Sequence, residues 1–314
     1  MDEATAASIV DEGPPRRDPQ LHLDILVMIM EFFDPCTVFG KQHEEAERDL
    51  RSFALVCKAW RQAAHPVLFR HLIVLSDPGS ELFFLRTAPR PYNVFLDLLR
   101  RPPQSCAYTR SFYFYREMEN GYELPDRTPL PPLPAFLGHL PNLKNVELYN
   151  PPPLCSMDGT IELSSILPAA ETRSLDVLTV TRCSIPFTEC LFPLLHQFNK
   201  VKELDMKHVN YPIASLPPGT LIPNPKFREI ELFDVDHCPG LLECLSYMIG
   251  NPSIDDDDAS LHEASVPVGG DEGLQILSVN VHDDDSLTGL QNMLNQSSAT
   301  LTSFILSRSR YQEG

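Results

Sequence analysis

A short apolar skeleton recurs along the chain and constrains the fold more than any other feature. Its fullest copy is Leu175–Ile185, LDVLTVTRCSI, which has apolar residues at positions one, four, six and eleven and cysteine at position nine. Further copies of the one-four-six skeleton begin at Leu143, Val201, Phe227, Leu274 and Leu301, and degenerate copies begin at Phe69 and Thr109. Self-similarity of this kind predicts a stack of structural units instead of one compact core.

The full pattern, L-x-x-L-x-L-x-x-[NC]-x-L, resembles that of leucine-rich repeats. The six clearer copies begin 32, 26, 26, 47 and 27 residues apart. Three of these intervals lie within the range of about 20 to 29 residues known for such repeats. The longest interval holds residues 251–273, which include the run Asp255–Asp258, and we expect a disordered acidic insertion there.

Helical spacing of apolar residues precedes several copies. The three clearest sets are Phe187, Cys190, Leu191, Leu194, Leu195 and Phe198; Leu241, Leu242, Leu245, Met248 and Ile249; and Leu287, Leu290, Met293 and Leu294. Alternation of strand and helix at this period predicts an α/β fold with a parallel sheet inside and helices outside. Residues 76–314 would form an irregular, curved leucine-rich-repeat-like solenoid, with uneven connections because the chain has 30 prolines.

The residues between the apolar positions are expected on the concave face of that sheet. Positions three, five and seven of successive copies bring acids and aromatics together there. The predicted target-binding residues are Glu147, Tyr149, Glu203, Asp205, Glu229, Glu231 and Phe233. Such a surface suits a partner that carries Lys or Arg. A solvated acidic face without a ligand explains the same pattern.

The N-terminal part of the chain is predicted to be helical. Residues 21–33, LHLDILVMIMEFF, carry apolar residues at helical spacing, and residues 49–64 form a second stripe with Asp49 as its N-cap. Pro66 would end the second helix. Two short helices hide too little apolar surface to be stable alone, so we expect an exposed apolar face that needs a partner.

The runs LHLDILVMIMEFF and LVCKAWRQAAHPVLFRHL resemble the F-box motif in the form found in fungal F-box-like proteins. The resemblance implies an F-box-like module at residues 19–75, after a disordered tail at residues 1–18. It implies docking on the Skp adaptor subunit of a cullin-RING ubiquitin ligase. The implied adaptor-binding residues are Leu21, Ile25, Leu26 and Ile29, with Val56, Cys57 and Trp60 bracing or completing the contact. Alternatively, Trp60 is a core residue and the helices only cap the repeats.

Charge and motif content restrict the function. The formal net charge of -18 disfavours nucleic acid and anionic membranes as partners. The acidic start, Asp2 and Glu3, and the short apolar runs predict neither a signal peptide nor a membrane span, and therefore a cytoplasmic or nuclear protein. The eight cysteines lack a Cys-x-x-Cys pair and are expected to be reduced. We find no pattern for a catalytic site, a metal or a cofactor, and we expect no enzymatic activity.

Together these features predict a substrate-recognition adaptor of an SCF-type ubiquitin ligase. The F-box-like helices would bind the Skp adaptor, and the repeat arc would hold a target protein. The alternative is a leucine-rich-repeat interaction scaffold with no role in ubiquitin transfer.

Overall fold

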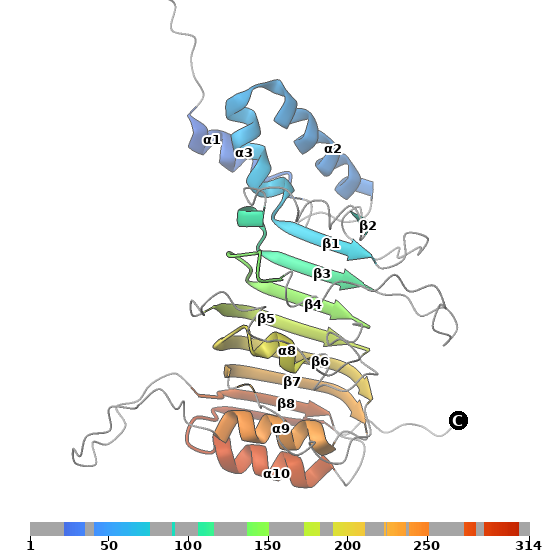
Figure 1. Cartoon of the computed structure of the whole chain (residues 1–314), viewed down its shortest axis with the longest axis vertical. Coiled ribbons are helices and arrows are strands. Elements are labelled where there is room, and N and C mark those ends of the chain that lie inside the picture. The colour runs from blue at the N-terminus through green and yellow to red at the C-terminus, as the bar shows by residue number, and fades with distance from the viewer. Residues whose placement is uncertain are drawn as a thin grey trace, which may run out of the picture.

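The chain forms an elongated stack of parallel strands with a helical module at its N-terminal end (Figure 1). This arrangement comes from a computed structural model, which describes residues 22–34, 41–75, 90–91, 106–115, 137–150, 173–182, 191–210, 223, 225–236, 239–250, 273–280 and 286–307. The predicted tail at 1–18 lies outside the described residues, and so does the predicted acidic insertion except for Gly273.

All nine described strands belong to one sheet, in the order β2-β1-β3-β4-β5-β6-β7-β8-β9, and every neighbouring pair is parallel. Their bounds are β1 His71–Leu75, β2 Arg90–Pro91, β3 Ser111–Tyr115, β4 Asn145–Tyr149, β5 Ser174–Thr181, β6 Lys200–Asn210, β7 Lys226–Asp236, β8 Ile276–Asn280 and β9 Ser303–Ser307. Each of the eight skeleton copies contains one strand. The predicted α/β class and parallel sheet are therefore confirmed.

Equivalent positions of the copies pair with one another across the sheet. Val177 on β5 pairs with Glu203 on β6, and Glu203 pairs with Glu229 on β7. At positions four and six of β6, Leu204 and Met206 are completely buried. The alternation of strand side chains thus separates a buried face from an open one, and the in-register pairing repeats that separation from β4 to β8. The last strand differs, because Phe304 and Leu306 of β9 are exposed.

At position two of each copy, the regular pattern of hydrogen bonds between neighbouring strands is interrupted. The carbonyl of Arg110 accepts hydrogen bonds from the backbone N–H groups of Lys144 (2.7 Å) and Asn145 (2.9 Å). The carbonyls of Arg70, Lys144 and Gln275 each accept two backbone N–H groups in the same way. Strict alternation would place positions one and four on opposite faces because they are three residues apart. The break allows both, such as Leu175 and Leu178 of β5, to be buried.

Position eight has an unusual backbone conformation in four successive copies. Asn150, Arg182, His208 and Asp234 all have positive φ angles, between 48° and 55°. The N–H of Asn150 donates to the carbonyl of Thr181, and the N–H of Arg182 to that of Lys207, both at 2.8 Å. A left-handed conformation costs a residue other than glycine about 1–2 kcal/mol. These inter-strand hydrogen bonds help to stabilise the left-handed conformation.

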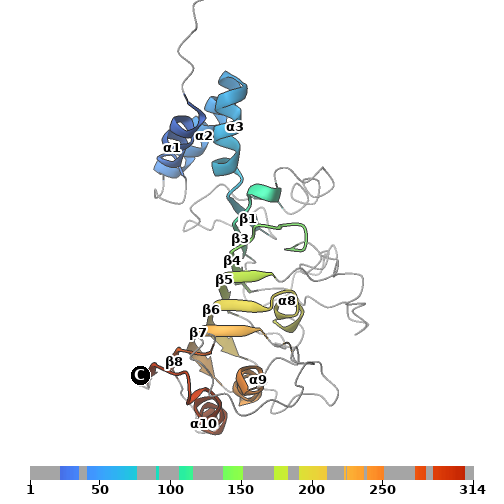
Figure 2. The ribbon, with the colours of Figure 1, turned by 90° about the vertical axis from the view of Figure 1, so that its left-hand side faces the viewer.

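Among the described residues, three helices cover one face of the sheet: α8 (Phe192–Leu195), α9 (Pro239–Gly250) and α10 (Ser286–Ser297). They lie on the same side of the strands in Figure 2, and we call the opposite side the open face. Their apolar residues form one core with the buried strand positions. Helices α9 and α10 match the predicted stripes. The stripe at 187–198 does not form one long helix, because within its described part only Phe192–Leu195 is helical, with Pro193 in its first turn.

The N-terminal module contains α1 (Leu23–Glu31), α2 (Lys41–Val56) and α3 (Lys58–Leu68). The prediction of one helix at 49–64 was wrong, because Cys57 adopts an extended conformation, φ -160° and ψ 177°, and separates α2 from α3. Asp49 lies inside α2 and is not an N-cap. Pro66 does not end α3, which continues to Leu68.

A small core of its own holds the module together. It consists of Leu26, Met30, Leu50, Ala54, Ala63, Ala64 and Val67, and it is separate from the core under the sheet. Phe53 packs between two aromatic rings, with centroid distances of 5.1 Å to Phe33 and 5.2 Å to Trp60. Helix α3 leads directly into β1, so the module continues the stack at its first long strand (Figure 1).

The close contact between α9 and α10 requires glycine at position 289. A Cβ there would lie 2.6 Å from the Cβ of Leu242, which is fixed to the backbone of α9. We expect Gly289→Ala to lower the melting temperature, because an overpacking cost of about 1–3 kcal/mol exceeds a gain of about 1 kcal/mol in helix propensity. The exposed neighbour Thr288→Ala also raises helix propensity and should not destabilise. If thermal unfolding shows both variants equally stabilised, the close contact is wrong.

Candidate functional site

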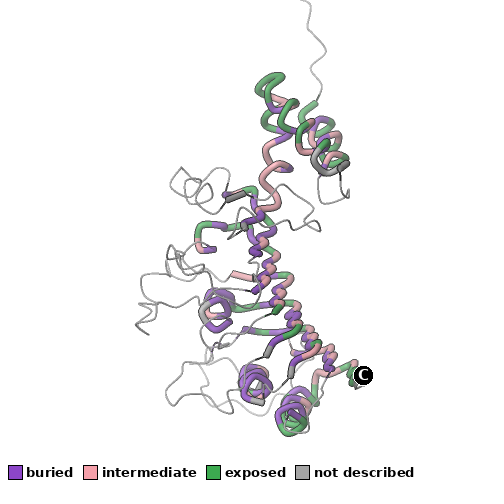
Figure 3. The backbone as a smooth tube through the Cα atoms, turned by 90° about the vertical axis from the view of Figure 1, so that its right-hand side faces the viewer, coloured by how far each residue is buried: buried purple, intermediate pink, exposed green. Residues whose placement is uncertain are grey.

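The helical module exposes an unusual amount of apolar surface. Six large apolar side chains are between 44% and 81% exposed: Leu23, Ile25, Met28 and Phe32 at α1, and Leu55 and Val56 at the end of α2. Exposed segments are prominent on these helices in Figure 3. We call these six residues the apolar docking surface. Ile25 and Val56 were among the predicted adaptor-binding residues, and Cys57 beside Val56 is exposed as well.

Three other predicted adaptor-binding residues have a different location. Leu26 is only 1% exposed and lies in the core of the module, so its assignment to the surface is corrected. Ile29 and Trp60 are partly buried against the same core. Leu21 lies outside the described residues. The helical stripe in the sequence combined the buried and exposed sides of α1, because both sides of this helix are apolar.

The sequence analysis missed Leu23, Met28, Phe32 and Leu55. Leu23 and Met28 lie on α1 and Phe32 caps its C-terminal end, and the apolar residues of this helix surround it instead of forming one stripe. An apolar helix with no polar side normally indicates burial on more than one side. That signal was present in the sequence and favours a partner on the side facing away from the module's core.

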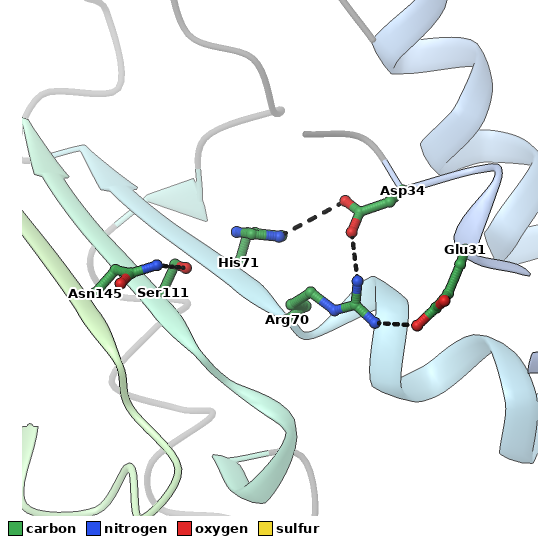
Figure 4. Close-up of polar contacts among 6 residues, drawn as sticks. All are labelled: Glu31, Asp34, Arg70, His71, Ser111 and Asn145. Carbon is green, nitrogen blue, oxygen red and sulfur yellow. Dashed lines mark hydrogen bonds and ion pairs between the residues drawn. The ribbon is translucent and has the colours of Figure 1, made fainter. Parts of the chain in front are cut away.

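A polar contact fixes the module against the first strands of the sheet (Figure 4). Asp34, which is 5% exposed, accepts a hydrogen bond from Nη1 of Arg70 at 2.7 Å. Its other carboxylate oxygen lies 3.6 Å from Nε2 of His71, and Glu31 accepts from Nη2 of Arg70 at 3.1 Å. Because Arg70 and His71 stand where α3 passes into β1, Asp34 ties the end of α1 to the start of the sheet.

The predicted target-binding acids lie on neighbouring strands of the open face. Glu203 pairs with Glu229, and Asp205 with Glu231, while Glu147 lies on β4 beyond Thr179 of β5. The pKa of Glu203 is raised, first by desolvation and then by repulsion from Glu229, Asp205 and Glu231. The structure therefore brings four of the predicted acids into one electrostatically repulsive cluster, which would gain from a cationic partner.

The sequence analysis predicted that Asp205 binds a target, but the structure does not leave its carboxylate available for a partner. It is only 7% exposed, and its Oδ2 accepts a hydrogen bond from Nζ of Lys207 at 2.6 Å. This bond is the largest cause of the raised pKa of Lys207. Asp205 lies two residues before Lys207 on the same strand face, so strand geometry makes the pair. The carboxylate of Asp205 thus lies buried at the base of the open face.

An arginine and a histidine lie beside the aromatic residues of the open face. The Arg182 guanidinium carbon lies 5.3 Å from the ring centroid of Tyr149. The His208 ring meets Phe233 edge-on at 5.8 Å, and its Nδ1 lies 2.6 Å from Oδ2 of Asp234. The sequence analysis missed Arg182 and His208 because they stand at position eight, where the positive φ changes the direction of the chain. The shared position was visible in the repeat alignment, but its conformation was not.

The described cysteines do not assemble into a reactive site. Burial raises the pKa of the Cys244 thiol to about 12, with a smaller contribution from Glu243, so this thiol stays protonated at neutral pH. Cys106 is also buried. Among the described residues, no three His, Cys, Asp or Glu side chains are grouped as metal ligands. Likewise, no described helix has the length and apolar character required to cross a bilayer.

In comparisons with known proteins, no protein-family model, curated protein or solved structure matched this chain.

We expect Asp34→Ala to lower the free energy of unfolding by about 1–3 kcal/mol, because a buried charge-assisted hydrogen bond is lost. The matched control is Glu31→Ala, which removes a half-exposed carboxylate from the same arginine and should cost below about 1 kcal/mol. Chemical denaturation measures both. Equal losses in the two variants would contradict the assignment of Asp34 as the main contact.

Stability should also respond to the repulsion around Glu203. A carboxyl whose pKa is raised by folding binds its proton more tightly in the folded state, so the ionised form is penalised above the folded pKa. Glu203→Gln should therefore raise the melting temperature at pH 7. The difference should vanish below about pH 4, where the carboxyl is neutral in both states. Asp176→Asn, an exposed acid on β5, is the control and should give no such gain. A lower melting temperature for Glu203→Gln at pH 7 would mean that Glu203 makes a net favourable contact.

Proposed function

We propose that this protein is the substrate-recognition adaptor of an SCF-type ubiquitin ligase, with an F-box-like module that binds the Skp adaptor subunit. The proposal includes the finer description of the sheet and its helices as an irregular leucine-rich-repeat solenoid. The chain acts by holding a target protein near the ubiquitin-charged enzyme, and no chemical step is assigned to its own residues.

The observation that carries the proposal is the apolar docking surface of a three-helix module with its own small core. Solvent-exposed apolar area costs about 25 cal/mol for each Å², and a large patch of it usually marks an interaction site. Here Met28 and Val56 are each 63% exposed, and Phe32 is 81% exposed. They lie within the segment that resembles the F-box, so surface and resemblance support the same partner.

The open face is the proposed target site. The carboxylate of Glu203 is repelled by those of Glu229 and Glu231, while Phe233 is exposed on β7 and Arg182 is exposed directly after β5. Arg and aromatic residues are common among the residues that dominate binding energy in protein interfaces. A target segment that bears Lys or Arg would relieve the repulsion among the acids.

The second candidate is an interaction scaffold without a role in ubiquitin transfer. The contacts of Asp34 with Arg70 and His71 favour this candidate as much as the first. They attach the module to the end of the sheet, where a capping unit of the repeat stack would lie. A cap, however, needs no apolar surface on its outer side, whereas an adaptor-binding module does.

The test is a double variant of the apolar docking surface, Met28→Glu with Val56→Glu. Because both side chains are largely exposed, we expect the fold to persist and Skp binding in calorimetry to weaken at least a hundredfold. Ile29 is avoided because it packs on the module's core. Tyr247→Glu, a change of an exposed aromatic on α9, is the control and should bind normally. Unchanged Skp binding by the double variant, or no binding by the unmodified chain, would leave the scaffold as the better function.

A further inference from the structure

The two edges of the sheet differ in how well they are protected against pairing with another chain. Strand β2, at one edge, consists only of Arg90–Pro91. Strand β9, at the other edge, has the sequence SFILS and contains neither a charged residue nor a proline. Native proteins usually protect edge strands by making them very short or by placing charges or proline on them. Strand β9 has none of these features, and the function proposed above does not use it.

The side chains of β9 are exposed at positions that are buried in the neighbouring strand. Phe304 is 40% exposed and Leu306 is 52% exposed, although their partners on β8, Leu277 and Val279, are buried. Among the described residues, no helix follows β9 to cover this face. Ile305 on the open face is 55% exposed. Strand β9 therefore presents apolar side chains to solvent on both faces of the sheet.

The backbone of β9 is also arranged to pair on its outer side. The N–H of Ser303 donates to the carbonyl of Gln275 at 3.0 Å, so the backbone groups of Ser303 point toward β8. Along a strand, the direction of these groups alternates from one residue to the next. Phe304 and Leu306 consequently direct their N–H and C=O groups away from β8, to a side on which no described strand pairs.

The sequence of β9 is complementary to itself. If two β9 strands align antiparallel about Ile305, Ser303 stands opposite Ser307, Phe304 opposite Leu306, and Ile305 opposite its own copy. Phe304 and Leu306 are the residues whose backbone groups point outward, so they form the hydrogen-bonded pairs, each of which exchanges two backbone hydrogen bonds. The two Ile305 residues form a pair without hydrogen bonds, in which side chains lie closest together.

We propose that β9 pairs antiparallel with β9 of a second copy of this chain, so that two sheets join into one. The symmetry axis passes between the two Ile305 residues and is perpendicular to the sheet. The open faces of both copies therefore lie on the same side of the dimer. Such a contact uses the same surface on both copies and closes at two, because β2 protects the other edge. The dimer does not depend on the ligase role.

Charge also favours a second copy at this edge. Two chains with a formal net charge of -18 repel each other, so they can associate only through a surface that adds no further repulsion. Strand β9 is such a surface because it is uncharged. Salt screens the repulsion between the rest of the two chains. Dimerisation should therefore strengthen as the salt concentration rises, and it should depend on protein concentration because the contact is small.

The test measures dimerisation by sedimentation velocity over a series of protein concentrations. The unmodified chain should show a monomer–dimer equilibrium. Ile305→Lys and Ile305→Glu should each weaken dimerisation at least tenfold, because like charges then stand directly opposite each other. An equal mixture of the two variants should recover the dimer, because Lys then stands opposite Glu. If the charged variants unfold, Ile305→Thr keeps a β-branched side chain and should still weaken dimerisation.

Two control variants separate this contact from other surfaces. Tyr247→Lys makes the same change in charge at an exposed aromatic residue of α9 and should dimerise normally. Met28→Glu with Val56→Glu alters the apolar docking surface and should also dimerise normally. The proposal is overturned if the unmodified chain is a monomer at every concentration, which would leave β9 to a strand of a different protein. It is also overturned if the Ile305 variants dimerise normally, if their mixture does not recover the dimer, or if the docking-surface variant abolishes it.

Discussion

The structure depends on the backbone hydrogen bonds that keep equivalent residues of successive copies in register. At position two, a carbonyl such as that of Arg110 accepts two N–H groups from the next strand, and this break allows positions one and four to be buried together. At position eight, the N–H groups of the left-handed residues Asn150 and Arg182 donate to carbonyls of the following strand. A one-residue slip would expose the apolar set of a strand, so burial and hydrogen bonding select the same register.

This register also organises the charges. Because equivalent positions stand side by side, a residue type that recurs in the sequence becomes a row on the surface. Glu203 and Glu229 form part of an acidic row on the open face, and Lys200 and Lys226 form part of a cationic one at the strand starts. The acidic residues around Glu203 repel it, and the buried apolar positions supply the stability that permits this repulsion.

The N-terminal module follows a different physical logic. Its few buried residues form a small core, and its apolar docking surface stays in water. It is attached to the stack through the continuous passage from α3 to β1 and through the contact of Asp34 with Arg70 and His71. A module attached in this way has a fixed orientation relative to the open face, which an adaptor needs if the bound target is to lie near a second protein.

The sequence by itself determined the parallel sheet, the pairing of equivalent positions and the row of acids. The spacing of apolar residues specifies which residues are buried. The position of a residue in its copy specifies the residue with which it pairs on the neighbouring strand. Only the tertiary structure decided how single side chains are used. Leu26 is in the core while Met28 is exposed, since α1 is apolar on all sides and only its neighbours distinguish them. Asp205 is bonded to Lys207, and Arg182 reaches Tyr149, because these contacts depend on side-chain packing and on the left-handed turn at position eight. Local patterns carry no information about such contacts.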